Sequence, residues 1–169
     1  MRTESTKEKI LELFFNFPTK RFHIRGISKI LKISAPAVSN NINKLEKDNL
    51  IIHNKGFMSE IYAKINNKFK KLKRAYNLKK IYESGLEDYL IEEFPLTTIV
   101  LFGSYSRGED IEKSDIDIAI FNKERKLNIE IFEKRLNRRI NIELINFKKI
   151  SPELKESIIN GITLSGDIS

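Results

Sequence analysis

The stretch Gly103-Ser104-Tyr105-Ser106-Arg107-Gly108-Glu109-Asp110-Ile111-Glu112-Lys113-Ser114-Asp115-Ile116-Asp117-Ile118 decides how the second half of this chain folds. It joins two apolar runs, Thr97 to Phe102 and Asp115 to Phe121, which are predicted as strands with a short helix between them. Asp115 and Asp117 are two residues apart, so both carboxylates lie on one face of the second strand. The alternating isoleucines then face a core on the other side.

This spacing indicates a particular chemistry. Two carboxylates side by side on a strand repel each other unless a hard cation lies between them. Gly103 permits a tight turn at the strand–helix junction, where backbone N–H groups and the Ser104 hydroxyl can donate to phosphate oxygens. A phosphate cradle beside a metal clamp is what nucleotidyl transfer requires.

The order Gly-Ser, ten residues, Asp-x-Asp resembles the signature of the nucleotidyltransferase superfamily that includes DNA polymerase β. With Gly108 and Ser114 also present, residues 95–165 are most similar to the minimal nucleotidyltransferases of prokaryotes. The resemblance implies that Gly103 and Ser104 hold the nucleotide's phosphates. It also implies that Asp115 and Asp117 bind Mg²⁺, with a nucleoside triphosphate, most readily ATP, as the donor.

The superfamily has a third carboxylate on the next strand, for which Glu143 is the candidate. Glu143 lies in an alternating apolar pattern from residue 139 to residue 145, and it stands where related proteins usually have Asp. The resemblance therefore implies that Glu143 is both a catalytic residue and a metal ligand. The alternative is an exposed residue on an edge strand. Arg107, one helical turn past Ser104, is either a third nucleotide contact or a surface residue.

Segments on either side complete the predicted second domain. A charged amphipathic stretch over 66–94 is predicted to be helical, with an interruption at Gly85 and an end at Pro95. After the central stretch, a helix is predicted from Ile129 to Asn137, a strand from Arg139 to Phe147 and a helix from Pro152 to Asn160. Strands that alternate with helices indicate an α/β domain, here with a mixed sheet.

The first third of the chain has a different pattern. Helices are predicted over 6–17, 23–31 and 34–48, followed by two short strands over 50–53 and 61–65. Ser34 is the expected N-cap of the third helix. The second helix is expected to bury Ile24, Ile27, Ile30 and Leu31. This layout resembles a winged helix-turn-helix of the MarR/ArsR-like type. The whole chain is then an α+β protein: a winged helix (1–66), a helical linker (67–94) and a nucleotidyltransferase domain (95–169).

Charge supports a nucleic-acid partner for the first part. Residues 1–82 hold 19 Lys and Arg against 6 Asp and Glu, a balance of +13, whereas the remainder carries −5. Such asymmetry favours contact with a polyanion such as duplex DNA, although a protein-docking or dimerisation module is the alternative. The residues expected to meet DNA are Pro36, Ser39, Asn40, Asn43, Lys44 and Lys47 on the third helix and Lys55 near the wing.

Other polar groups are expected to be structural or solvated. His23 and His53 have no partner at metal-ligand spacing. The acidic residues of the connecting loop are expected in solvent, namely Glu109, Asp110 and Glu112. A lysine cluster is either a solvated helix face or an extension of the DNA surface, namely Lys68, Lys70, Lys71, Lys73 and Arg74. With no cysteine and no apolar run of about 18 residues, a cytoplasmic location without membrane contact is expected.

The predicted activity is transfer of a nucleoside monophosphate, AMP from Mg·ATP above all, to a hydroxyl. The resemblance suggests an antitoxin that modifies a tyrosine of a HEPN-type toxin protein, here in trans, with the winged helix regulating the promoter. The main alternative is a DNA-binding transcription regulator whose nucleotidyltransferase-like domain only senses nucleotide. An enzyme that modifies a small molecule ranks last, and a homodimer stays open.

Overall fold

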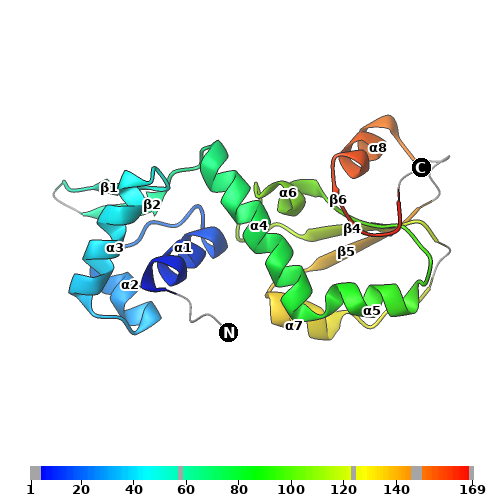
Figure 1. The fold of residues 1–169 in the computed structure, drawn as a ribbon, viewed down its shortest axis with the longest axis horizontal. Coiled ribbons are helices and arrows are strands. Elements are labelled where there is room, and N and C mark those ends of the chain that lie inside the picture. The colour runs from blue at the N-terminus through cyan, green and yellow to red at the C-terminus, as the bar shows by residue number, and fades with distance from the viewer. Residues whose placement is uncertain (1–4, 57–58, 123–124, 146–149, 168–169) are drawn as a thin grey trace. The chain divides into compact units, whose positions relative to one another are not determined.

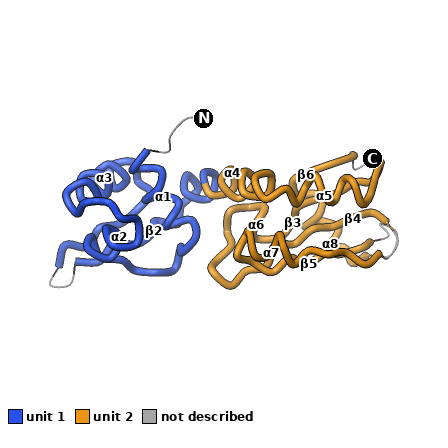
Figure 2. The backbone as a smooth tube through the Cα atoms, turned by 90° about the horizontal axis from the view of Figure 1, so that it is seen from below, with its two compact units in different colours: residues 1–72 blue, residues 73–169 orange. Residues whose placement is uncertain are grey.

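The computed structural model describes residues 5–56, 59–122, 125–145 and 150–167. The chain forms two compact units, residues 1–72 and 73–169 (Figure 2). The helix α4 (Asn67–Ser84) begins in the first unit and continues into the second. The predicted functional boundaries at residues 66 and 95 remain a prediction.

The first unit consists of three helices followed by a two-stranded hairpin (Figure 1). Its elements are α1 (Thr6–Asn16), α2 (Ile24–Leu31), α3 (Ala35–Lys47), β1 (Ile51–Asn54) and β2 (Glu60–Ala63). Lys32 has a left-handed φ of 54° at the end of α2, which turns the chain sharply. Ser34 then caps α3 by accepting a hydrogen bond from the backbone N–H of Ala37, as the sequence predicts.

The core of the first unit is built from one face of each helix. Its fully buried side chains are Ile10, Phe14, Ile27, Val38, Ile42, Leu45 and Ile61. The hairpin is antiparallel, and Phe22 pairs with its second strand through an isolated bridge to Ile61. The burial expected for Ile30 is wrong, because 54% of its surface is exposed. A two-turn helix such as α2 presents only a narrow face to its neighbours, and Ile27 occupies that face.

The second unit is a four-stranded mixed sheet with helices on both faces (Figure 1). Its further elements are α5 (Leu86–Glu93), β3 (Ile99–Phe102), α6 (Gly103–Arg107), β4 (Ile116–Ile120), α7 (Glu130–Leu136), β5 (Ile140–Leu144), α8 (Pro152–Ile159) and β6 (Ile162–Ser165). The strand order is β5-β4-β3-β6. Only β4 and β5 run parallel, whereas β3 is antiparallel to both of its neighbours. The expected mixed sheet is thus confirmed, but β6 was not anticipated.

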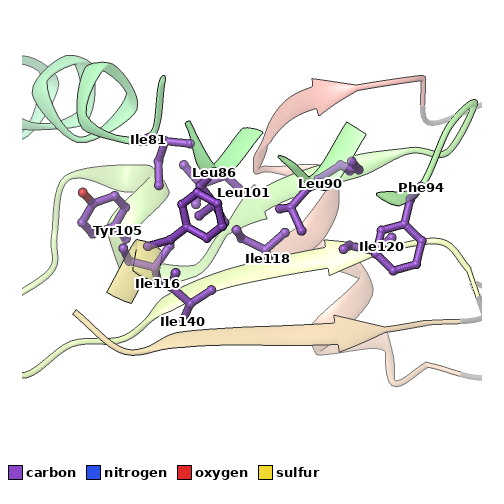
Figure 3. Packing of buried hydrophobic residues seen from close by; sticks show 12 residues of the cluster. Ile81, Leu86, Leu90, Phe94, Leu101, Tyr105, Ile116, Ile118, Ile120 and Ile140 are labelled. Carbon is purple, nitrogen blue, oxygen red and sulfur yellow. The ribbon is translucent and has the colours of Figure 1, made fainter. Parts of the chain in front are cut away.

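Each face of the sheet has its own core. The larger one packs β4 isoleucines against α4, α5 and α7, and Figure 3 shows Ile116, Ile118 and Ile120 beside Leu86, Leu90 and Leu101. The smaller one packs Val100, Phe102 and Ala119 against α8. Alternate residues of β4 therefore belong to opposite faces. Asp117 shares the parity of Ala119, so it lies on the α8 face.

Gly85 separates α4 from α5, as the sequence predicts. Its φ of +77° lies in the left-handed region, which lets the chain change direction between the two helices. Ile81 and Leu86 on either side of this break are both fully buried, so the turn itself is part of the core. No helix in the described ranges is long and apolar enough to cross a membrane.

Candidate active site

The two aspartates of the Asp-x-Asp motif lie at the start of β4. Asp117 is the second residue of the strand and is half-buried, whereas Asp115 is exposed and stands immediately before the strand. The predicted strand therefore starts one residue too early. The expected alternation is confirmed, because Ile116 and Ile118 are fully buried on the opposite face. A buried strand thus holds Asp117 in a defined direction.

The Gly103 turn comes directly up to Asp117. Phe102 is paired with Asp117 across β3 and β4, and Gly103 follows with a φ of +73°. A Cβ built on Gly103 would stand 2.3 Å from Asp117 Oδ2, far inside contact distance. A side chain here would be strained by the backbone conformation and would displace the Asp117 carboxylate. The predicted phosphate turn and the predicted metal ligand are indeed adjacent.

The other residues of the predicted cradle lie in α6. Ser104 is half-buried, and the buried Ser106 donates a hydrogen bond to the carbonyl of Gly103 at 2.9 Å, which braces the turn. Because α6 has only five residues, its dipole is small, and its free N–H groups are what it offers to a phosphate. Arg107 forms an exposed ion pair with Glu109, with 3.0 Å between Nε and Oε2. Its contact with nucleotide remains a prediction.

Glu143 lies on β5, on the same face as Asp117, but it is not directly opposite. The parallel register pairs Asp117 with Asn141 and Ala119 with Glu143. The Asn141 amide donates to Asp117 Oδ1 at 3.2 Å and to Glu143 Oε1 at 3.3 Å. Sequence reasoning missed Asn141, because the residue opposite Asp117 follows only from the strand register.

The donors gathered here suit a hard cation. Asp115 and Asp117 supply carboxylate oxygens, which Mg²⁺ prefers, and the cramped space at Gly103 shows that Asp117 Oδ2 points into the turn. Glu143 offers a further carboxylate on the same face, two residues farther along the neighbouring strand. Within the described ranges, no three His, Cys, Asp or Glu side chains are close enough to hold a metal by themselves. Mg²⁺ usually binds through one or two carboxylates together with substrate phosphates. The residues present therefore fit a cation that arrives with a nucleotide.

The solvated position expected for Asp110 is wrong. This residue is 2% exposed, and Lys73 Nζ lies 3.1 Å from its Oδ2. Asn77 donates to Asp110 Oδ1 at 2.7 Å and to the carbonyl of Tyr105 at 2.9 Å. Arg138 approaches Oδ2 at 3.6 Å and donates to the carbonyl of Ile111 at 2.8 Å. These contacts clamp the loop between α6 and β4, which connects the cradle to the metal ligands.

The surface position expected for Lys73, on a solvated or DNA-binding helix face, is likewise wrong. Lys73 is 1% exposed, and it also donates to the backbone carbonyl of Asp110. Burial lowers the pKa of Lys73 below its ordinary value, and the nearby Asp110 carboxylate offsets part of this effect. Burial also raises the pKa of Tyr105, with the charge of Asp110 as a smaller cause. Both shifts have the same main cause, the burial of this clamp away from water.

In the first unit, the predicted DNA-contacting residues lie mostly in solvent. The exposed ones are Pro36, Asn40, Asn43, Lys44, Lys47 and Lys55, whereas Ser39 is half-buried. The histidines have structural contacts, as expected: His23 Nδ1 lies 2.5 Å from the Ser59 carbonyl and His53 Nε2 lies 2.8 Å from the Ser59 hydroxyl. The exposed polar face of α3 is therefore available for binding, and its ligand stays a prediction.

Comparison with known proteins agrees with this geometry. Residues 84–167 match the family described as polymerase beta, nucleotidyltransferase. Over 79 residues the chain is 39% identical to a protein of Methanocaldococcus jannaschii that is provisionally named a protein adenylyltransferase, a match that covers 41% of this chain and 76% of that relative. No solved structure matches the chain. The chain belongs to the polymerase β nucleotidyltransferase family, and it is a transferase of the nucleotidyltransferase type.

Proposed function

We propose that this chain transfers AMP from Mg·ATP to a hydroxyl group of a partner protein and releases pyrophosphate. The observation that carries the proposal is the close approach of the Gly103 turn to Asp117 Oδ2, which joins a phosphate cradle to a metal-binding carboxylate. The name of the archaeal relative, a protein adenylyltransferase, supports both the adenylyl group and a protein acceptor.

The roles proposed for the residues follow from their positions. Gly103 and Ser104 would hold the phosphates through backbone N–H groups and a hydroxyl. Asp115 and Asp117 would hold Mg²⁺, and Glu143 adds a third carboxylate on the same face of the sheet. When bound, Mg²⁺ would neutralise phosphate charge and lower the pKa of the attacking hydroxyl. The half-exposed position of the site leaves room for a large acceptor.

The test is a labelling experiment with the full chain, Mg²⁺ and a lysate of the source cells. Label on the α-phosphate of ATP should appear in a protein band, whereas label on the γ-phosphate should not. Phosphodiesterase treatment should release AMP from that band. A tyrosine of a HEPN-type toxin protein is the acceptor that the resemblance suggests. Binding of ATP without transfer to any acceptor would instead indicate a nucleotide-sensing regulator.

We also propose that residues 1–66 form a winged helix-turn-helix that binds duplex DNA. The supporting observation is the exposed row of Asn40, Asn43, Lys44 and Lys47 on α3, in a part of the chain with excess positive charge. Such short polar and basic groups can contact base edges and phosphates.

Salt-dependent DNA binding tests this second proposal. The full chain should bind the DNA upstream of its own gene, with affinity that falls steeply as salt rises. Lys47→Ala should weaken binding to all sequences and lower the salt slope by about one. Asn43→Ala should change the preference between sequences, at a cost of about 1–3 kcal/mol. Lys9→Ala, at an exposed position on α1, is the matched control. Absence of binding at low salt would leave a protein-docking module.

A further inference from the structure

The feature behind this inference is the amide group of Asn141. It stands on β5 directly opposite Asp117, at the position where a side chain of the neighbouring strand comes closest. Its Nδ2 carries two hydrogens, and both have acceptors: Asp117 Oδ1 at 3.2 Å and Glu143 Oε1 at 3.3 Å. An uncharged donor thus lies between two carboxylates.

A cation shared by Asp117 and Glu143 would have to occupy the position of the Asn141 amide group. Two oxygens that ligate one Mg²⁺ each lie about 2.0–2.1 Å from it. Glu143 is offset from Asp117 by one strand and two residues, a separation on the order of 8 Å between the backbones. The long Glu143 side chain closes this gap only as far as Asn141. Turned by 180°, the amide would place its own oxygen against both carboxylates, which is unfavourable.

The two oxygens of Asp117 therefore differ. Oδ1 accepts from Asn141, whereas Oδ2 points to the Gly103 turn, where a Cβ would approach it to 2.3 Å. Asp115 is exposed at the same end of β4. The side of Asp117 that remains for a metal is thus the side of the proposed phosphate cradle.

From this geometry we propose that Asn141 is a positioning residue that restricts the site to a single divalent cation. The cation is held by Asp117 Oδ2 and Asp115 together with the nucleotide, and Glu143 is not one of its ligands. Asn141 takes the place of a second cation by donating to both carboxylates. This inference rests on the proposed nucleotidyl transfer, and it narrows the roles of the three carboxylates.

The experiment is electron paramagnetic resonance of Mn²⁺ bound to the full chain with one equivalent of α,β-methylene-ATP. Two Mn²⁺ ions about 3.5–4 Å apart, as in two-metal sites, give an exchange-coupled spectrum. The wild-type protein should show an uncoupled ion at both one and two equivalents of Mn²⁺. Asn141→Asp replaces the donor by a carboxylate and should produce the coupled pair. Glu143→Gln should leave the wild-type spectrum unchanged.

Control variants distinguish a failure of this inference from a failure of the proposed nucleotidyl transfer. Asn128→Asp makes the same charge change at an exposed residue outside the proposed site and should leave the spectrum as in the wild type. Asp117→Asn should remove the bound-ion signal altogether, and a signal that survives would overturn the metal site itself. A coupled pair in the wild type, or none in Asn141→Asp, would overturn only the role of Asn141. Melting temperatures in EDTA serve as the measure of correct folding.

Discussion

Asp110 and Asp117 lie seven residues apart in one acidic segment, yet they occupy opposite kinds of environment. Asp110 is buried against Lys73 and Asn77, and its loop is held in place by these contacts. Asp117 is half-buried beside the Gly103 turn, and among its described contacts only an uncharged amide donates to it. A carboxylate whose cation is built into the protein serves as a structural counterion. One without such a cation is available for a ligand.

The largest effect in this comparison is expected from the replacement of Asp117. Asp117→Asn should reduce nucleotidyl transfer by more than about 100-fold, since even residues that only support metal ligands cost 10- to 100-fold. The melting temperature without metal should hold or rise, because repulsion with neighbouring carboxylates is relieved. Initial rates with α-labelled ATP and thermal unfolding in EDTA measure the two effects. Asp88→Asn, at an exposed position on α5, is the control. Full activity in a folded Asp117→Asn protein would refute the assignment.

Asp110→Asn, in contrast, should lower the stability of the protein. It leaves the buried Lys73 cation without a carboxylate, so the free energy of unfolding should fall by about 3–5 kcal/mol. Chemical denaturation followed by circular dichroism measures this loss. The double variant Lys73→Met with Asp110→Leu removes both charges and should recover most of the stability. If the single variant is as stable as the wild type, the clamp does not hold the loop.

Two glycines with the same backbone conformation distinguish the proposed nucleotide site from the rest of the fold. Gly103→Ala and Gly85→Ala each place a side chain at a φ above +70°, at a cost of about 1–2 kcal/mol. At Gly103 the new Cβ also meets Asp117 Oδ2, whereas at Gly85 the nearest atom is Arg135 Nη1 at 3.7 Å. Transfer activity should therefore be lost in Gly103→Ala and kept in Gly85→Ala. Equal activities in the two variants would mean that the Gly103 turn does not hold nucleotide.

The smallest effect concerns pH. Because burial lowers the pKa of Lys73 in the folded chain, the unfolded chain binds more protons between that lowered pKa and the ordinary value of 10.5. Within this window the Lys73 contribution to stability rises with pH, and below it the contribution is constant. The stability difference between the wild type and Lys73→Met should thus shift in favour of the wild type as pH approaches 10.5. Urea denaturation at several alkaline pH values measures the trend, and a flat difference contradicts it.

Much of the fold follows from local patterns. The capping by Ser34, the break at Gly85 and the alternation of Ile116 and Ile118 each depend on residues close together in the chain. The short strand β6 escaped prediction because its apolar–polar alternation covers only four residues, and it exists through pairing with β3. The burial of Asp110 escaped it as well, since its partner Lys73 is 37 residues away.

The sequence by itself determined the class of chemistry: a glycine turn, a serine and two aspartates at fixed spacing indicate phosphate and metal binding. It also determined that positive charge concentrates in residues 1–82. The tertiary structure alone decided which acidic residue is a structural counterion and which residue stands opposite Asp117. The physical reason is that burial and strand register are set by contacts between distant segments. The local pattern of a polar residue is the same whether its partner is a lysine, an amide or a metal ion.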